Sequence, residues 1–88
     1  MPGIQEIIRR FEDVGWFSDT TNNEDGGKFC ESITTFDEDI ALRYYYTDNE
    51  WCFNRTGAVS EASVLALLEA LERLTQEAKE NGDSADNN

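Results

Sequence analysis

Residues 60–80 carry one apolar stripe at the spacing of an α-helix, and this stripe constrains the fold more than any other feature. The stripe consists of Val64, Leu67, Leu68, Leu71, Leu74 and Ala78. The opposite side is polar and mostly acidic, so the predicted helix must bury its stripe against another element. Ser60 is a suitable N-cap residue, and Gly82 is predicted to mark the end of the helix.

A second amphipathic helix is predicted for residues 4–14. Its apolar face consists of Ile4, Ile7, Ile8, Phe11 and Val14. Gly15 is predicted to end this helix in the left-handed conformation, which would let Trp16 fold back onto Phe11. Because each helix has a single stripe to bury, the two helices need a common surface to pack against.

The residues between the helices are predicted to supply that surface as a sheet. Aromatic and β-branched residues indicate three strands, over residues 28–36, 40–46 and 51–55, with short polar connections between them. Residues 18–27 (SDTTNNEDGG) are predicted to form a mobile loop, because they lack periodicity and end in Gly-Gly. The predicted fold is therefore α+β: a helix, a three-stranded antiparallel meander and a helix (α-β-β-β-α), with both helices on one sheet face.

The chain of 88 residues has the size of one domain. We expect a single acidic α+β domain over residues 1–80 and a disordered polar tail over residues 81–88, because the tail has too few apolar side chains to pack. The sequence has no apolar run long enough to span a membrane and no apolar region typical of a secretory signal. A cytoplasmic location is therefore expected.

Alternation along the strands assigns side chains to the two faces of the sheet. If Asp48-Asn49 forms the hairpin tip, Tyr46 lies opposite Trp51 and Tyr44 lies opposite Phe53. The predicted core face then carries Phe29, Ile33, Leu42, Tyr44, Tyr46, Trp51 and Phe53. The predicted open face carries Cys30, Ser32, Thr34, Arg43, Tyr45, Cys52 and Asn54. A slip of one residue would exchange the two sets.

The sequence predicts neither an enzyme nor a metal protein. It has no histidine, which is the commonest general base and the commonest transition-metal ligand. Cys30 and Cys52 are predicted on strands about 9–10 Å apart, too far for a disulfide, so two free thiols are expected. The paired acids in the hairpin connections are expected to be exposed, which leaves them without the burial that raises a catalytic pKa. We expect no catalytic residue, no metal site and no cofactor.

The acidic residues are unevenly distributed. The chain has 19 Asp and Glu against 7 Lys and Arg, a net charge of −12. Nine acids and two bases fall within residues 18–50, which gives that stretch a charge of −7. Such a field repels nucleic acid and anionic membranes and attracts basic protein surfaces. Two other interpretations stay open: ordinary solvation of the surface, and adaptation to high salt.

The predicted meander places the start of its first strand and its second hairpin tip at the same end of the sheet. Four acids gather there, and we name this region the acidic end: Glu24, Asp25, Asp48 and Glu50. Arg43 and Tyr45 lie on the open face, and Glu31 is expected to reach water around the margin of an edge strand. The candidate partner-binding residues are therefore Glu24, Asp25, Glu31, Arg43, Tyr45, Asp48 and Glu50.

These features favour a non-enzymatic protein-binding module. The best hypothesis is an inhibitor that docks on a basic surface of a nucleic-acid-handling protein without contacting nucleic acid or membrane itself. In size, acidity and α+β build the chain resembles small phage-encoded inhibitors of host defence, anti-CRISPR proteins among them, and immunity proteins that neutralise nuclease toxins. That resemblance is one of composition and implies no site residue.

Two further possibilities stay open. The acidic row on the last helix could imitate a nucleic-acid backbone, although bases interrupt it; the row comprises Glu69, Glu72, Glu77 and Glu80. Alternatively, the chain is a small assembly module that forms a homodimer through its open sheet face or an edge strand, residues 28–36 or 51–55. The sequence is compatible with a monomer or a homodimer.

Overall fold

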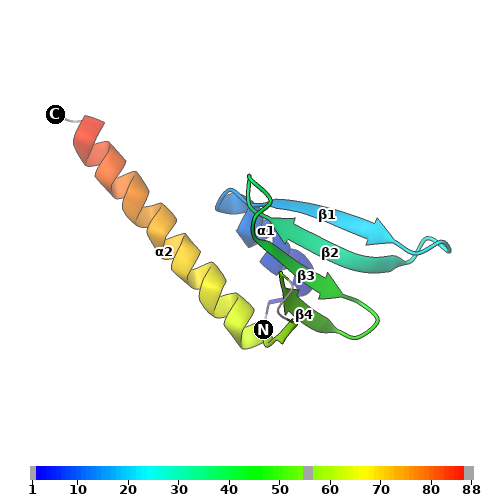
Figure 1. Ribbon diagram of the computed structural model, residues 1–88. Helices are drawn as coiled ribbons and strands as arrows, with labels where there is room; N and C mark the ends of the chain where they lie inside the picture. Colours follow the sequence, from blue (N-terminus) through cyan, green and yellow to red (C-terminus); the bar gives the residue numbers. More distant parts are fainter. Residues whose placement is uncertain (1, 55–56, 87–88) are drawn as a thin grey trace.

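A computed structural model describes the backbone of residues 2–54 and 57–86 and the side chains of residues 2–54 and 57–80. Two helices and five strands follow one another along the chain (Figure 1). They are α1 (Ile4–Asp13), β1 (Phe17–Asn22), β2 (Lys28–Thr34), β3 (Ala41–Tyr45), β4 (Glu50–Phe53), β5 (Ala58–Val59) and α2 (Glu61–Asp86). The strands form one antiparallel sheet in the order β1-β2-β3-β4-β5. The predicted α+β class is confirmed.

The sheet has five strands, so the predicted three-stranded meander is wrong in its strand number. Residues 18–27, expected to form a loop, instead supply most of β1 and the turn that joins it to β2. Thr20 and Thr21 have the β-branched side chains that strands favour, and Asp25-Gly26 is a strong hairpin signal. At the other edge, β5 pairs with β4. Residues 28–36 and 51–55 were expected to form the two edge strands. Their counterparts in the described part of the chain, β2 and β4, are therefore interior strands.

The three predicted strands are present as β2, β3 and β4, with tighter bounds, and Arg55 lies outside the described residues. The predicted pairing of the last two is wrong by two residues. Tyr44 lies opposite Trp51, and Leu42 lies opposite Phe53. The connection is longer than the expected two-residue tip, with Asn49 in the left-handed region at φ 51°. An even shift keeps every side chain on its predicted face.

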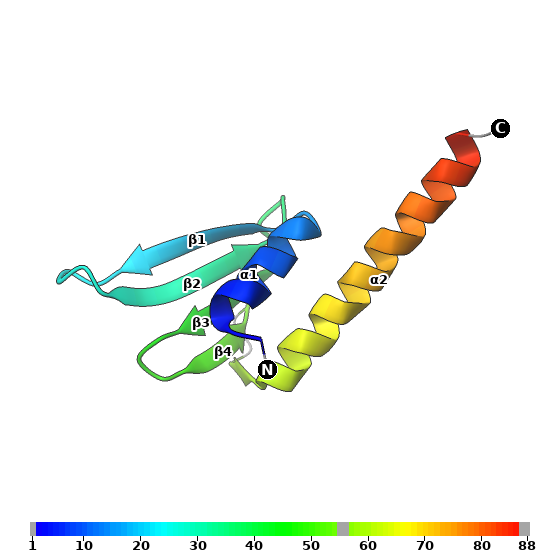
Figure 2. The same cartoon turned by 180° about the vertical axis from the view of Figure 1, so that it is seen from behind.

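The core lies between one face of the sheet and the two helices. The sheet contributes Ile33, Leu42, Tyr44 and Trp51, α1 contributes Ile7, Ile8 and Phe11, and α2 contributes Val64 and Leu68. Figure 2 shows α1 lying across this face, with α2 starting beside β4. Tyr46 and Phe53 are partly buried against the same cluster. The predicted core face is therefore largely correct.

Phe29 is the exception on the predicted core face, because 38% of it is exposed. The pairing of β1 with β2 is irregular at this point: Asn22 lies opposite Lys28, and Thr21 lies opposite Cys30. Phe29 is thus an extra residue without a partner in β1, as in a β-bulge. Its ring instead contacts that of Tyr45 edge-on, with 5.7 Å between the ring centroids.

The end of α1 follows the predicted geometry. Gly15 has φ 95°, and the N–H of Trp16 donates to the carbonyl of Phe11 at 3.1 Å. The Gly15 N–H donates to the carbonyl of Glu12 at 3.0 Å, which completes a Schellman motif. The rings of Phe11 and Trp16 lie 5.1 Å apart. The chain therefore turns sharply after α1 and enters β1.

Only the first part of α2 packs on the core, and the rest projects beyond the sheet (Figure 1). Within the predicted stripe, Val64 and Leu68 are buried, whereas 61% of Leu74 is exposed. The predicted helix end at Gly82 is wrong, because the backbone stays helical to Asp86. The division into a domain of residues 1–80 and a disordered tail of residues 81–88 stays a prediction, and residues 87–88 lie outside the described residues.

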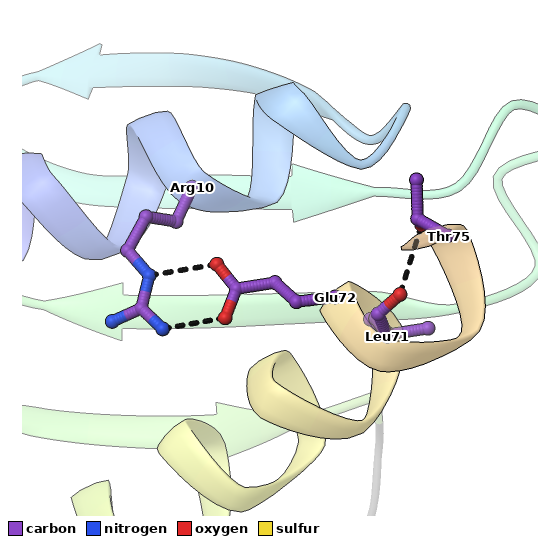
Figure 3. A network of polar contacts seen from close by, with 4 residues as sticks. All are labelled: Arg10, Leu71, Glu72 and Thr75. Atoms are coloured by element: carbon purple, nitrogen blue, oxygen red, sulfur yellow. Dashed lines mark hydrogen bonds and ion pairs between the residues drawn. The ribbon is translucent and has the colours of Figure 1, made fainter. Parts of the chain in front are cut away.

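One ion pair ties α2 to α1 (Figure 3). Arg10 Nε donates to Glu72 Oε2 at 2.9 Å, and Arg10 Nη2 donates to Glu72 Oε1 at 2.6 Å. The hydrogen bond from Arg10 lowers the pKa of the Glu72 carboxyl below its ordinary value. One turn further on, Thr75 Oγ1 donates to the Leu71 carbonyl at 2.8 Å. The two parallel hydrogen bonds between Arg10 and Glu72 orient α2 at the point where its contact with the core ends.

Candidate protein-binding surface

The four residues of the acidic end lie on two turns at one end of the sheet. The β1–β2 turn carries Glu24 and Asp25, and the β3–β4 turn carries Asp48 next to Glu50 at the start of β4. Both turns lie at the same end of the antiparallel sheet (Figure 1), and all four side chains are exposed. The sequence correctly predicted that these residues lie at the same end of the sheet. Their part in binding stays a prediction.

Hydrogen bonds within the β1–β2 turn fix the shape of this part of the acidic end. Asn23 N–H donates to the Gly27 carbonyl at 2.7 Å, and Gly26 N–H donates to the Asn23 carbonyl at 3.0 Å. The Asp25 carboxylate accepts from the Gly27 N–H at 2.9 Å. Gly26 has φ 92°, which favours glycine because a side chain is strained there. Glu24 is thus presented on a defined turn.

Glu31 does not reach water, contrary to expectation. It is 2% exposed, because β1 covers the side of β2 that was expected to be an edge. Thr20 lies directly opposite Glu31 on β1, and its hydroxyl donates to Glu31 Oε1 at 2.5 Å. The Tyr46 hydroxyl donates to Glu31 Oε2 at 2.5 Å. A buried carboxylate with two donors has a structural role in this position.

Tyr46 takes part in a wider polar contact around Glu31. Gln5 Nε2 on α1 donates to the Tyr46 hydroxyl at 3.4 Å, and the Lys28 ammonium lies 5.8 Å from the centroid of the Tyr46 ring. Burial, followed by the hydrogen bond to Glu31, raises the pKa of Tyr46 to about 12. The tyrosine therefore stays a protonated donor far above neutral pH.

Arg43 and Tyr45 lie on the open face, as predicted. Arg43 lies opposite Ser32 on β2 and Cys52 on β4, whereas Tyr45 lies opposite Cys30 and Glu50. Arg43 is exposed, and in the described part of the chain Arg10–Glu72 is the ion pair found. The Arg43 guanidinium therefore has no carboxylate partner among the described residues.

The two cysteines are free, as the sequence predicted. Cys30 lies on β2 and Cys52 on β4, with β3 between them. Cys30 is buried, and Cys52 is partly exposed. Cys52 Sγ lies 4.0 Å from Glu50 Oε1.

An exposed aromatic pair at the opposite end of the sheet was missed by the sequence analysis. Phe17 at the start of β1 is 54% exposed, and Phe36 in the β2–β3 connection is 86% exposed. Their ring centroids lie 6.2 Å apart. Phe17, Ser32, Thr34 and Glu38 are among the residues that line a groove of about 290 Å³ beside the pair. Recognising residues 17–22 as a strand would have placed Phe17 on the open face.

The β2–β3 connection, which contains Phe36, also carries the acids Asp37, Glu38 and Asp39. The Asp37 carboxylate accepts from the Thr35 hydroxyl at 2.8 Å and from the Asp39 N–H at 3.2 Å. The hydrogen bond from Thr35, followed by that from the Asp39 N–H, lowers the pKa of Asp37. Glu38 has φ 62°, and its side chain lines the groove beside Phe17. The open face therefore has carboxylates at both ends.

Among the described residues, no group of three or more His, Cys, Asp or Glu side chains could hold a metal ion. Within the same part of the chain, neither helix combines the length and apolar character needed to cross a membrane. Comparisons with protein-family models, curated proteins and solved structures found no match. The arguments for a function therefore come from the surface itself.

Proposed function

We propose that this chain is a non-enzymatic, acidic protein-binding module. Its acidic end and open sheet face dock on a basic surface of another protein. The observation that carries the proposal is the gathering of Glu24, Asp25, Asp48 and Glu50 on two neighbouring turns at one end of the sheet. All four are exposed, so their combined field can act on an approaching partner.

The open face offers contacts beyond charge. Arg43 is exposed, and Tyr45 is half-buried beside Phe29. Arginine and tyrosine are enriched among the residues that contribute most to protein interfaces. The acids at the rim would steer the encounter, and the residues on the strands would determine which basic surface fits.

The proposed target is a nucleic-acid-handling protein, because such proteins have strong basic patches. A chain with a net charge of −12 would be repelled by nucleic acid itself. Binding over a basic patch would block access of nucleic acid to the target. The module would then act as an inhibitor, of an anti-defence or immunity type.

Charge reversal at two matched places tests the proposal. The unmodified chain, Asp48→Lys/Glu50→Lys and Glu77→Lys/Glu80→Lys are each used to capture proteins from a lysate of the source cells at low and moderate salt. Both double variants change the charge by the same amount, and all four positions are exposed. We expect the unmodified chain and Glu77→Lys/Glu80→Lys to capture a basic protein that Asp48→Lys/Glu50→Lys does not capture. The capture of this protein should weaken as the salt concentration rises. Equal capture by all three chains would contradict the proposal.

A second candidate function is a homodimer, which the exposed Phe17–Phe36 pair favours. β1 is a sheet edge next to this pair, and its free backbone groups could extend the sheet into a second copy. Sedimentation at two salt concentrations discriminates between the two functions. A dimer that persists at both, and that Phe17→Ser/Phe36→Ser abolishes, would support assembly. A monomer at both would support the binding module.

A further inference from the structure

The outer side of β1 is an open edge of the sheet. β1 comes first in the strand order and, among the described residues, pairs only with β2 (Figure 1). Five of its six residues are exposed. Natural sheets usually protect such an edge with lysine, proline, a bulge or a very short strand. β1 contains neither lysine nor proline, and its irregularity lies only at its last residues, Thr21 and Asn22. The edge is therefore available to another strand.

The hydrogen bonds between β2 and β3 show which way the backbone groups of β2 point. The Thr35 N–H donates to the Ile40 carbonyl at 3.1 Å, and the Tyr46 N–H donates to the Phe29 carbonyl at 3.0 Å. Both bonds continue the register of β2 and β3 beyond the ends of the strands. In an antiparallel pair, directly opposite residues are hydrogen-bonded at every second position. Odd-numbered residues of β2 therefore bond to β3, and even-numbered residues bond to β1.

The same alternation assigns the backbone groups of β1. Ser32, an even-numbered residue of β2, lies opposite Asp19, so Asp19 bonds to β2. Its neighbours Ser18 and Thr20 consequently point their N–H and carbonyl groups away from β2, toward the open edge. These two residues can offer an added strand two donors and two acceptors.

The charge along this edge is acidic. Four exposed acids accompany it from its start to its end: Glu12, Asp19, Glu24 and Asp25. The Ser18 hydroxyl donates to the Glu12 carboxylate at 2.7 Å, which holds this acid beside the start of β1. Lys28, the base of β2, lies opposite Asn22 near the turn. A second copy of β1 would bring like charges together, whereas a basic strand would pair with these acids.

The open face gives the edge an apolar contact as well. Phe17 is 54% exposed and belongs to this face together with Asp19, because the two residues are separated by one position. Both line the groove of about 290 Å³, to which Glu38 adds a second carboxylate. Every second side chain of an added strand would lie on this face, beside Phe17 or Asp19.

We infer that β1 pairs with an extended, basic segment of the partner, which adds a strand to the sheet. The inference rests on the proposed function and specifies the form of the segment that is bound. Backbone hydrogen bonds to Ser18 and Thr20 supply affinity, and contacts of the alternating side chains with Asp19 and its neighbours supply specificity. β1 leads directly into the turn that carries Glu24 and Asp25, so one partner can cover the acidic end and this edge together.

The test uses three capped hexapeptides: Lys-Val-Lys-Val-Lys-Val, the same peptide with N-methylated backbone amides, and Glu-Val-Glu-Val-Glu-Val. N-methylation removes the backbone donors and keeps the charge. NMR titration measures affinity, and amide hydrogen exchange measures protection. We expect the first peptide to slow the exchange of the Ser18 and Thr20 amides, the N-methylated peptide to bind about tenfold more weakly, and the glutamate peptide not to bind. Equal affinity for the first two peptides would overturn the inference.

Two variants of the chain locate the binding. Asp19→Lys reverses a charge on β1, and Glu77→Lys makes the same change at an exposed position on the projecting part of α2. Asp19→Lys should weaken the binding of the unmethylated lysine peptide by about threefold or more, and Glu77→Lys should change it much less. Equal losses in the two variants would show that the peptide responds only to net charge, which would overturn the placement on β1.

The exchange experiment also detects a second copy on the edge. Protection of Ser18 and Thr20 that rises with protein concentration in the absence of peptide would overturn the inference. Its failure is distinguishable from failure of the proposed function. A chain whose two amides stay unprotected with the lysine peptide, but which still captures a basic protein through Asp48 and Glu50, retains its function and loses only the strand pairing.

Discussion

At the scale of single residues, Glu31 differs from the exposed acids of the surface, because it is buried and accepts a hydrogen bond from Tyr46. The two hydroxyl donors of Glu31 come from Thr20 on β1 and from Tyr46 just after β3. A buried carboxylate that loses a donor keeps the cost of its burial. This network therefore links the strand missed by the sequence analysis to the centre of the sheet.

Replacement of Tyr46 by phenylalanine tests that link. Tyr46→Phe should lower the free energy of unfolding by about 1–3 kcal/mol, because Glu31 loses one of its donors while the ring is kept. Denaturant unfolding measures the change. Tyr45→Phe is the matched control, since no hydrogen bond of its hydroxyl is found in the described part of the chain, and it should change stability much less. Equal effects of both variants would contradict a special role for Tyr46.

The raised pKa of Tyr46 gives a pH dependence with a definite sign. Below pH 10 its hydroxyl is protonated in the folded and the unfolded chain. Between pH 10 and about pH 12 the unfolded chain releases this proton and the folded chain retains it, so rising pH favours unfolding. The stability of the unmodified chain should therefore fall more steeply in this window than that of Tyr46→Phe. Parallel pH profiles would show that Tyr46 titrates normally.

At the scale of elements, the sequence predicted the helices and the three interior strands because their patterns are periodic. The stripe of α1 and the aromatic run of β3 each repeat over several residues. β1 has only Phe17 as a large apolar residue, and its exposure pattern does not alternate, so periodicity could not reveal it. The two-residue error in the β3–β4 register came from the length of the turn, which alternation leaves undetermined.

The β1–β2 hairpin depends on the backbone conformation of Gly26. Gly26→Ala should destabilise the hairpin by about 1 kcal/mol, because φ 92° is strained for a residue with a side chain, although nothing lies within 4 Å of the added methyl. Amide hydrogen exchange of β1 measures this locally. Gly26→Asn should lose less than Gly26→Ala, because asparagine tolerates positive φ better. Slower β1 exchange in Gly26→Ala than in the unmodified chain would contradict this account.

The Arg10–Glu72 pair links the two helices, and its effect should be small because both side chains are partly exposed, by 28% and 36%. Glu72→Gln should reduce stability slightly at neutral pH and low salt. The lowered pKa of Glu72 means that this contribution is present above its ordinary pKa of 4.5 and disappears as pH falls below it. Thermal unfolding at several pH values measures the difference, with Glu77→Gln as control. A difference that grows in acid would contradict the assignment.

At the scale of the whole molecule, charge and shape act together. The acidic end occupies one end of the sheet, and the exposed part of α2 projects away from the sheet in both views (Figures 1 and 2). The sequence predicted the grouping of Glu24, Asp25, Asp48 and Glu50, because antiparallel connections alternate between the two ends of a sheet. It misplaced Glu31 because the covering strand was missed, and it missed Phe36 because the exposure of a connection depends on the final packing.

Mapping the surface that a captured basic partner covers tests most directly whether the acidic end and the open face bind it. Backbone amide NMR shifts and hydrogen exchange are measured for the isotope-labelled chain, free and bound, at low and moderate salt. We predict the largest changes in the turns at residues 23–27 and 46–50 and along β3, with weaker binding as salt rises. Changes confined to residues 74–80 of α2, or to Phe17 and Phe36, would contradict it.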